Sequence, residues 1–361
     1  MKITPRFGPA KPARSAHEHL WCAMHLPGAM PRAIGWSPRW GCCPVAVKSS
    51  GSQPRRGGKT LAQGIALGDS RRRMFRGRDQ LRRVVMLCSL VIGAAVTRAA
   101  DVPARPSAGC SAATLDRGRE LHRTIDVDGV SRAYILDVPD SVQPKKPAPL
   151  VLDFHGFGHS AEGVWNVSGF KPLAARDGVI MVYPDGLPVH LLGRDAPGWE
   201  IFTTEKNRDL AFTSMLLDHL EKTYCIDRAR VFSTGFSNGA YFSYLLACRM
   251  ADRFAAVAPV SGGQVPGACD PGRAVPVLIH HGLQDDLVPV AQARAARDAW
   301  IQRDRCHEHV SNGCERHRDC RDGSEVEYCE GDFAHRWPLD ATERIWEFFR
   351  AYPMPVKTSD Q

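Results

Sequence analysis

The run Gly235-Phe236-Ser237-Asn238-Gly239 places a serine between two glycines, where an expected strand gives way to an expected helix. The letters RVFST before it are typical of a strand, and NGAYFSYLLACRM after it has helical spacing. A serine on such a tight turn exposes its hydroxyl, and the glycines leave room for the strained backbone. The helix start favours negative charge developing beside it. We therefore expect Ser237 to be a nucleophile; the alternative is a plain Gly/Ser turn.

A serine hydroxyl needs a base to take its proton, and the base needs a carboxylate to orient it. Asp285 and Asp286 follow the apolar run at 275–280. A carboxylate just past the end of a strand lies at the ligand-binding edge of a parallel sheet. We expect Asp285 to be this acid. Asp286 is the alternative for the role, and a solvated acidic turn is the alternative for the pair.

The base must come later in the chain, where four histidines are candidates: His307, His309, His317 and His335. The first three lie in a polar, cysteine-rich stretch, and we expect them to face water. His335 lies in a loop between a short expected strand at 325–328 and the last expected helix at 341–351. We expect His335 to be the base, with a structural histidine as the alternative.

A glycine-rich turn, His155-Gly156-Phe157-Gly158-His159-Ser160, directly follows the expected strand at 149–155. Such a turn frees backbone N–H groups that can stabilise the oxyanion formed when a serine attacks a carbonyl. We expect the N–H groups of Phe157 and Asn238 to form this oxyanion hole. His155 is expected to brace the loop, and a catalytic role for it is the alternative.

Twelve cysteines divide unevenly along the chain. Eight of them follow residue 100, namely Cys110, Cys225, Cys248, Cys269, Cys306, Cys314, Cys320 and Cys329. An even number in an exported domain indicates disulfides. The four between 306 and 329 are expected to form two local bridges that pin a loop near His335. A structural zinc site with the neighbouring histidines is the alternative, although no CxxC pair is present.

Charge separates the N-terminal part from the rest. The chain has a formal charge of +8, but residues 1–73 hold 13 Lys+Arg against two acids, so residues 101–361 are net acidic. We expect residues 1–73 to be a disordered basic extension, either read from too early a start or serving as an interaction tail. Residues 74–100 have the basic, apolar and small-residue regions of a secretory signal, with an uncleaved anchor as the alternative. We therefore expect a secreted protein, extracellular or periplasmic, with no nucleic-acid partner.

Past residue 110, short apolar runs alternate with amphipathic stretches, which indicates an α/β fold with a mostly parallel sheet flanked by helices. We expect one domain at residues 101–361. The expected strands are 132–139, 149–155, 179–183, 230–234, 255–260, 275–280 and 325–328. The expected helices are 210–223, 238–251, 290–303 and 341–351.

The motifs HGFGHS, YPDGL, GFSNGAY, ADRFAAVAPVSG, HHGLQDDLVP and AHRWP, in this order over roughly residues 110–351, carry a resemblance. The chain resembles the secreted esterases that include poly(3-hydroxybutyrate) depolymerases and feruloyl esterases. The resemblance implies an α/β-hydrolase fold and hydrolysis of carboxylic esters, with neither cofactor nor metal. It assigns Ser237 as nucleophile, Asp285 as acid and His335 as base.

The chain also departs from this group, because Arg336 follows His335 where a threonine is usual. The departure changes the pocket wall and leaves the substrate open. Trp165, Trp199 and Trp337 are expected near the site, where aromatic walls would suit a phenolic acyl group; core packing is the alternative for each. The group's polymer-degrading members often carry a separate binding domain, which is absent here, so we expect soluble or short esters.

Several functions remain open on the sequence. A feruloyl-type esterase comes first, and a hydrolase of hydroxyalkanoate oligomers second. An acyltransferase on the same fold and a non-catalytic, hydrolase-like binding protein are more distant. The binding protein is disfavoured, because it would have no need of a serine, an acid and a histidine in this order.

Overall fold

The computed structural model describes residues 102–111, 115–202, 206–264, 267 and 269–355. The expected basic extension at 1–73 and signal sequence at 74–100 lie outside the described residues. Within the described part, no helix combines the length and the apolar character needed to cross a membrane.

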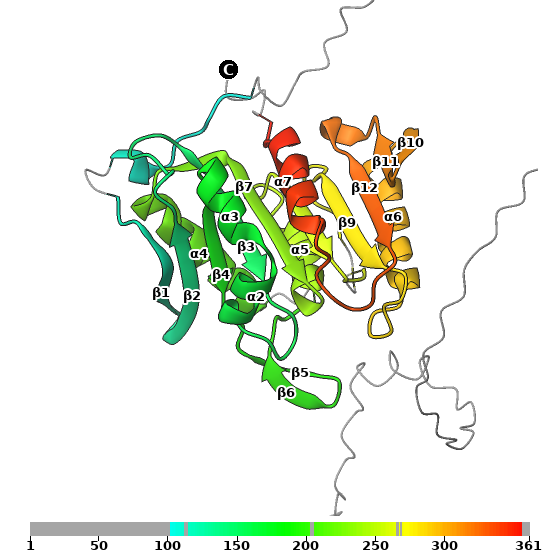
Figure 1. Cartoon of the computed structure of the whole chain (residues 1–361), viewed down its shortest axis with the longest axis horizontal. Helices are drawn as coiled ribbons and strands as arrows, with labels where there is room; N and C mark the ends of the chain where they lie inside the picture. Colours follow the sequence, from blue (N-terminus) through cyan, green and yellow to red (C-terminus); the bar gives the residue numbers. More distant parts are fainter. Residues whose placement is uncertain (1–101, 112–114, 203–205, 265–266, 268, 356–361) are drawn as a thin grey trace, which may run out of the picture. The chain divides into compact units, whose positions relative to one another are not determined.

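A ten-stranded sheet forms the centre of the described chain (Figure 1). Its strands, in spatial order, are β1 (Gly118–Val127), β2 (Val130–Val138), β4 (Ile180–Pro184), β3 (Ala148–Phe154), β7 (Ile226–Phe236), β8 (Ala256–Val260), β9 (Val277–Gly282), β12 (Val326–Gly331), β11 (Cys314–Arg318) and β10 (Glu308–Asn312). Every neighbouring pair from β4 to β12 is parallel. The pairs β1–β2 and β10–β11 add antiparallel strands at the two edges.

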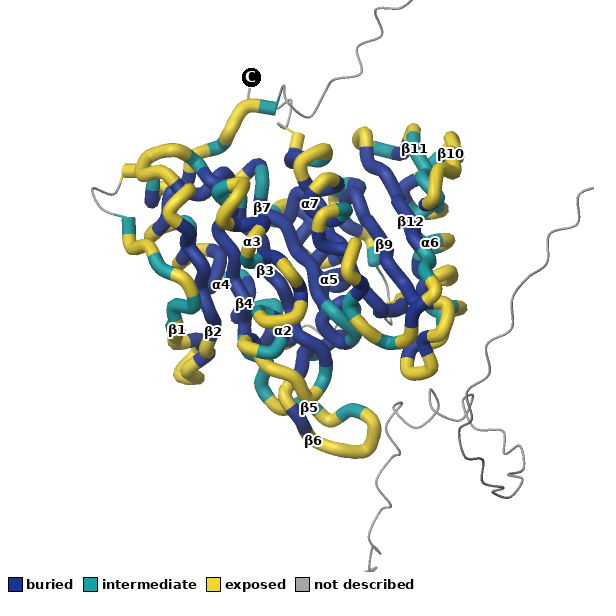
Figure 2. Tube along the Cα trace, in the orientation of Figure 1, coloured by how far each residue is buried: buried dark blue, intermediate teal, exposed yellow. Residues whose placement is uncertain are grey.

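Helices cover both faces of this sheet. On one face lie α2 (Ala161–Val167), α3 (Phe170–Asp177) and α7 (Ala341–Ala351), whose apolar side chains pack in one core cluster. On the other lie α4 (Arg208–Thr223), α5 (Asn238–Arg249) and α6 (Val290–Asp304), which pack in a second cluster. The central strands between them are buried, as the dark tubes of Figure 2 show. Burial on both faces explains why strands such as β4, β8 and β9 are apolar along most of their length.

The expected α/β architecture is confirmed, and each strand and helix expected from the sequence is present with ends shifted by a few residues. Several elements were missed. They are β1, α2, α3, β10, β11 and the separate two-stranded hairpin of β5 (Pro188–Leu191) and β6 (Arg194–Pro197). Four of the missed strands lack a clear strand pattern. The strands β5 and β6 are only four residues long, and β10 and β11 consist mostly of polar residues.

Eight cysteines pair into four disulfides, as the even count predicted. The pairs are Cys110–Cys225, Cys248–Cys269, Cys306–Cys320 and Cys314–Cys329. The last two are the expected local bridges of the cysteine-rich stretch. The alternative of a zinc site built on these four cysteines is wrong, because each sulfur is bonded to another sulfur.

Parallel strands bring their carboxyl ends to one edge of the sheet. The glycine-rich turn follows β3, Ser237 follows β7, Asp285 lies just past β9, and His335 lies just past β12. Four segments that are far apart in sequence therefore converge on one edge, which is where the site is built.

Candidate active site

Ser237 occupies a sharp turn between β7 and α5. Its backbone has φ 55° and ψ −116°, a conformation that costs free energy for a residue with a side chain. The flanking glycines make the turn possible. A Cβ at Gly239 would overlap the carbonyl oxygen of Phe154, and one at Gly235 would lie 2.6 Å from the carbonyl oxygen of Gly239. Close backbone packing therefore requires glycine at positions 235 and 239. The strained Ser237 is held in place by the hydrogen bond from its N–H to the carbonyl of Val260 (2.9 Å).

The turn also places Ser237 at the start of α5, as its N-cap residue. The first N–H groups of a helix have no partner inside the helix and carry partial positive charge. Asn238 is the first residue of α5, and its side chain is buried. That side chain accepts a hydrogen bond from the N–H of Trp199 (2.7 Å) and donates one to the carbonyl of Trp199 (3.3 Å). The pair of bonds fixes Asn238, and with it the first turn of the helix.

Asp285 and His335 are hydrogen-bonded to each other. Nδ1 of His335 donates to Oδ2 of Asp285 at 2.7 Å, while Oδ1 of Asp285 accepts from the N–H groups of Leu287 (3.1 Å) and Val288 (2.8 Å). The Asp285 side chain is fully buried and that of His335 is 10% exposed. Because Nδ1 carries the proton in this bond, Nε2 of a neutral His335 is the nitrogen available to accept one.

Only one of the two candidate acids contacts His335. Asp285 contacts His335, whereas Asp286 is exposed to solvent. The reason is the turn after β9, in which Asp285 points inward and bonds two backbone N–H groups of its own loop.

His281 is a neighbour of this pair that the sequence analysis missed. Its buried Nε2 donates to the carbonyl of Val288 (2.8 Å) and lies 3.4 Å from Oδ2 of Asp285. Burial lowers the pKa of His281, which favours its neutral form. His281 therefore supports the loop that holds Asp285. Its spacing four residues before the acid, at the end of a strand, is the signal that could have identified it.

His335 also packs against the serine turn. Its ring lies over that of Phe236, with centroids 4.7 Å apart, and Phe236 directly precedes Ser237. His307, His309 and His317, by contrast, belong to the hairpin region of β10 and β11. The first two are exposed as expected, but the side chain of His317 is largely buried, so the expectation that it faces water is wrong. There, His317 pairs with Val326 at the start of β12, while His335 follows the other end of that strand.

The glycine-rich turn after β3 lies against Ser237, since a Cβ at Gly156 would stand 3.3 Å from Cβ of Ser237. The expectation that His155 braces this loop is confirmed. Its Nδ1 donates to the carbonyl of Gly156 (2.7 Å), and its Nε2 accepts from the N–H of Gly186 (2.9 Å). Burial lowers the pKa of His155, consistent with a neutral, doubly bonded ring.

Phe157 is half-buried next to the β5–β6 hairpin. The guanidinium of Arg194, from β6, lies over its ring at 4.6 Å, and the N–H of Gly158 donates to the carbonyl of Pro197 (2.7 Å). The hairpin thus supports the turn that carries Phe157. Arg194 was not a candidate from the sequence, because an exposed arginine in a polar stretch carries no signal.

The three tryptophans occupy different environments. Trp199 is fully buried, donates from Nε1 to the carbonyl of His155 (2.9 Å), and stacks on Phe242. The expectation that it forms part of the substrate-binding wall does not fit this position; its side chain is a core residue that joins the loop after β3 to α5. Trp165 and Trp337 are half-buried, and Trp337 donates from Nε1 to Oγ1 of Thr342 (3.0 Å).

The fold and this arrangement define an α/β-hydrolase: a mostly parallel sheet between two helical layers, with a serine on a strained turn and an Asp–His pair at the same edge. Residues 198–320 match the Dienelactone hydrolase family. The acetyl xylan esterase from Aspergillus awamori has the same fold, with a TM-score of 0.51 and 16% identity over 64% of this chain and 100% of that one.

Two curated relatives are more similar in sequence. Feruloyl esterase D from Neurospora crassa is 32% identical over 215 residues, covering 56% of this chain and 70% of the relative. Feruloyl esterase C from Emericella nidulans is 30% identical over 231 residues, covering 62% of this chain and 77% of the relative. The chain therefore belongs to the feruloyl esterase family of α/β-hydrolases, and it is a carboxylic ester hydrolase.

Proposed function

We propose that Ser237, Asp285 and His335 are the catalytic triad of a secreted serine esterase. The observation that carries the proposal is the 2.7 Å bond between His335 Nδ1 and Asp285 Oδ2, made by a histidine that packs against the residue preceding Ser237. Ser237 attacks the ester carbonyl while Nε2 of His335 takes the hydroxyl proton. His335 then gives this proton to the leaving alcohol. Water then attacks the acyl-enzyme while His335 takes a proton from it. His335 returns this proton to Oγ of Ser237 as the acyl–oxygen bond breaks and the acid is released.

Asp285 acts on the orientation and charge of His335. Its buried carboxylate fixes the ring with Nδ1 protonated and stabilises the imidazolium that forms during each proton transfer. The hydrogen bonds from Leu287 and Val288 hold the carboxylate in turn.

The oxyanion hole in this proposal consists of the backbone N–H groups of Phe157 and Asn238. The proximity of Gly156 to Ser237, and the position of Asn238 at the first turn of α5, support it. Both donor segments are held by neighbouring residues. His155 and Arg194 hold the turn that carries Phe157, and the Trp199 backbone holds Asn238, so the two N–H groups stay in place as negative charge develops on the substrate oxygen.

For the substrate we propose esters of ferulic acid or similar phenolic acids. The names of the two curated feruloyl esterases support this choice. Trp165 and Trp337 remain the proposed aromatic contacts for the acyl group, because both keep part of their surface exposed.

Hydrolysis of methyl ferulate by the purified protein tests the substrate, compared with a soluble 3-hydroxybutyrate oligomer under the same conditions. We expect faster cleavage of methyl ferulate and loss of that activity in the Ser237→Ala variant. Faster cleavage of the oligomer would favour the polyester-type alternative instead.

Acetyl esters of xylan are a second candidate. A bifunctional acetylxylan esterase/xylanase from Neocallimastix patriciarum is 32% identical over 164 residues, covering 45% of this chain and 23% of that protein. Acetylated xylan, added as a third substrate to the same assay, distinguishes the two acyl groups.

Export is part of the proposal as well. Four disulfides are typical of proteins that fold in an oxidising compartment, and the signal-like sequence at 74–100 would direct the chain there. N-terminal sequencing of the exported protein tests both the signal and the status of residues 1–73; a start near Asp101 is the expected result.

A further inference from the structure

The antiparallel hairpin of β10 and β11 brings two histidines and a glutamate together on one face. His309 lies directly opposite His317 in the register, and Glu315 is two residues before His317 on the same strand. Residues two apart on a strand point to the same side. The two imidazole rings stack with centroids 4.7 Å apart, and one ligand atom from each of the three side chains lies within 4.8 Å of the other two.

Glu315 and His317 are partly withdrawn from solvent, whereas His309 is exposed. The Nε2 atom of His317 is buried and has no hydrogen-bond partner among the described residues, and Oε2 of Glu315 lies 3.5 Å from it. A buried ring nitrogen without a partner costs free energy unless something binds it.

The carboxylate of Glu315 is oriented by a second residue. The guanidinium of Arg297, from α6, lies 3.1 Å from Oε2 of Glu315. Hydrogen bonds of this kind to a ligating carboxylate are typical of the groups that surround metal ligands. A carboxylate has enough lone pairs to keep the Arg297 contact and bind an ion as well.

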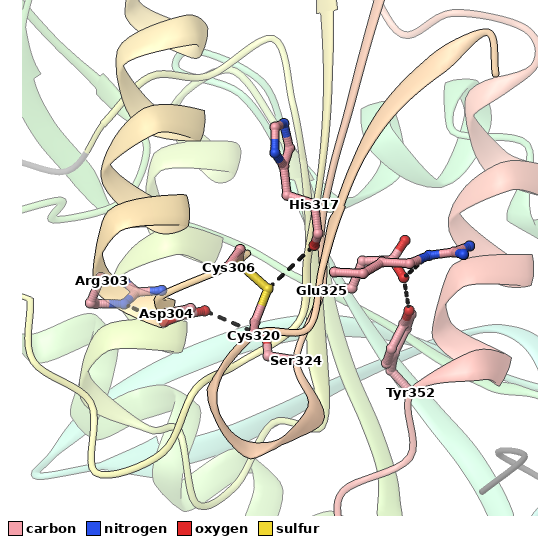
Figure 3. Close-up of a disulfide and its surroundings, with 9 residues drawn as sticks. Arg303, Asp304, Cys306, His317, Cys320, Ser324, Glu325 and Tyr352 are labelled. Atoms are coloured by element: carbon pink, nitrogen blue, oxygen red, sulfur yellow. Dashed lines mark hydrogen bonds and ion pairs between the residues drawn. A yellow bond between two sulfur atoms is a disulfide. The ribbon is translucent and has the colours of Figure 1, made fainter. Parts of the chain in front are cut away.

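Two disulfides hold the backbone on which the cluster sits. Cys306–Cys320 closes the chain around the hairpin, and Cys314–Cys329 ties the first residue of β11 to β12. Figure 3 shows the imidazole of His317 pointing away from the Cys306–Cys320 bridge. A hairpin pinned in this way loses little conformational freedom when an ion binds, which favours affinity.

We propose that His309, Glu315 and His317 bind one divalent transition-metal ion of the zinc type. Two imidazole nitrogens and one carboxylate oxygen are ligands that Zn²⁺ commonly uses, and water can take the fourth position of a tetrahedral site. Bonds of about 2.0–2.2 Å place neighbouring ligand atoms about 3.4 Å apart, so the cluster contracts on binding. His309 is exposed and free to make most of this movement.

The proposed site is separate from the esterase chemistry. His317 pairs with Val326 at the start of β12, whereas His335 follows Gly331 at the end of the same strand. The bound ion would cross-link the two strands of the hairpin and stabilise this edge of the sheet. A second grouping, Cys314, Glu327 and Cys329, does not compete, because its two sulfurs form a disulfide.

Zinc titration of the chelator-treated full chain tests the proposal, using calorimetry for stoichiometry and the thermal unfolding temperature for stability. The variants are His309→Asn and His317→Asn, and His307→Asn is the matched control from the same region. Other histidines and cysteines of the chain can also bind zinc. The quantity compared is therefore the number of zinc ions bound per chain, in each variant against the wild type. Co²⁺, whose visible absorption reports tetrahedral nitrogen and oxygen ligands, gives an independent measurement.

We expect His309→Asn and His317→Asn each to lose one zinc equivalent or to bind it at least about tenfold more weakly. Both should also lose the zinc-dependent rise in unfolding temperature, while His307→Asn should keep the wild-type behaviour. Equal zinc binding by wild type and both variants would overturn the proposal, as would the absence of any zinc-dependent rise in the wild type. If His317→Asn does not fold, the exposed His309→Asn decides the outcome alone.

Discussion

Both carboxylate oxygens of Asp285 accept hydrogen bonds. Oδ1 accepts from the backbone N–H groups of Leu287 and Val288, and Oδ2 accepts from Nδ1 of His335. Replacing Asp285 with asparagine would present an amide to Nδ1 of His335 and favour the wrong tautomer. We expect Asp285→Asn to lower kcat for ester hydrolysis on the order of 10⁴-fold. The matched control is Asp286→Asn, which alters an exposed neighbour and should leave kcat unchanged. Equal losses in the two variants would argue against Asp285 as the orienting acid.

The buried Asp153, on β3, makes the free energy of unfolding of the protein depend on pH. Burial raises the pKa of the Asp153 carboxyl to about 7. The Ser168 hydroxyl lowers the same pKa, but by a smaller amount. Between about pH 4 and pH 7 the folded protein keeps a proton that the unfolded chain has lost, so this residue makes stability fall as pH rises, by up to about 1.4 kcal/mol per pH unit. Above about pH 7 its effect levels off.

The Asp153→Asn variant removes this contribution. We expect the free energy of unfolding of the variant, relative to wild type, to increase from about pH 4 to about pH 7. Urea unfolding of both proteins across this range measures the difference. A difference that does not vary with pH would show that Asp153 titrates normally.

Single residues also show where sequence reasoning stops. Ser237, Asp285 and His335 could be proposed as a triad from the sequence because their chemistry, their order and their places after strands all agree. Trp199 was misplaced, because residue type alone does not tell whether an indole lines a pocket or fills the core beside Phe242. Arg194 acts through a contact with the distant Phe157, which one sequence does not reveal. His281 contacts its own loop, and its spacing four residues before Asp285 was a signal left unused.

Among the elements, the β7–α5 turn depends most strongly on one residue type. The Cβ of an alanine at position 239 would overlap the carbonyl oxygen of Phe154, which belongs to the neighbouring strand β3. We expect Gly239→Ala to lower the free energy of unfolding by about 3 kcal/mol or more and to reduce activity by displacing Ser237. Chemical denaturation measures the first effect.

Gly272→Ala is the control for that variant. Nothing lies within 4 Å of a Cβ at this position, so the substitution should be neutral or slightly stabilising, by roughly 0.5 kcal/mol. Similar effects of the two substitutions would mean that the close packing of α5 against β3 is not what requires Gly239.

Whether an element was predictable depended on its burial. The strands β3, β7, β8 and β9 are covered on both faces, so their sequences are apolar runs that stand out. The strands of β5–β6 are only four residues long, and those of β10–β11 are mostly polar, so neither hairpin gives a long apolar run. Their pairing is fixed by the turns and, for β10–β11, by disulfides, neither of which gives a periodic pattern in the sequence.

For the whole molecule, the disulfides differ in how much chain they enclose. Cys110–Cys225 joins residues 115 apart in sequence, whereas Cys306–Cys320 spans 14. In the chain-entropy account, removing the long bridge costs about 4.7 kcal/mol and removing the short one about 3 kcal/mol. We therefore expect Cys110→Ser/Cys225→Ser to lower the unfolding temperature more than Cys306→Ser/Cys320→Ser does. Differential scanning calorimetry of the two double variants makes the comparison, and the reverse order would contradict it.

The shared edge of the parallel sheet explains why three residues spread over about a hundred positions can act together. The α/β alternation made this edge predictable, and the spatial order of β3, β7, β9 and β12 in the sheet sets which loops meet there.

The proposed role of Ser237 is tested most directly by covalent labelling with a fluorophosphonate, followed by mass spectrometry of the digested protein. The probe reacts with a serine that a neighbouring base activates. We predict one labelled peptide containing Ser237, no labelling in Ser237→Ala, and strongly reduced labelling in His335→Ala. Labelling at another residue, or none at Ser237 in a folded protein that hydrolyses methyl ferulate, would contradict the proposed mechanism.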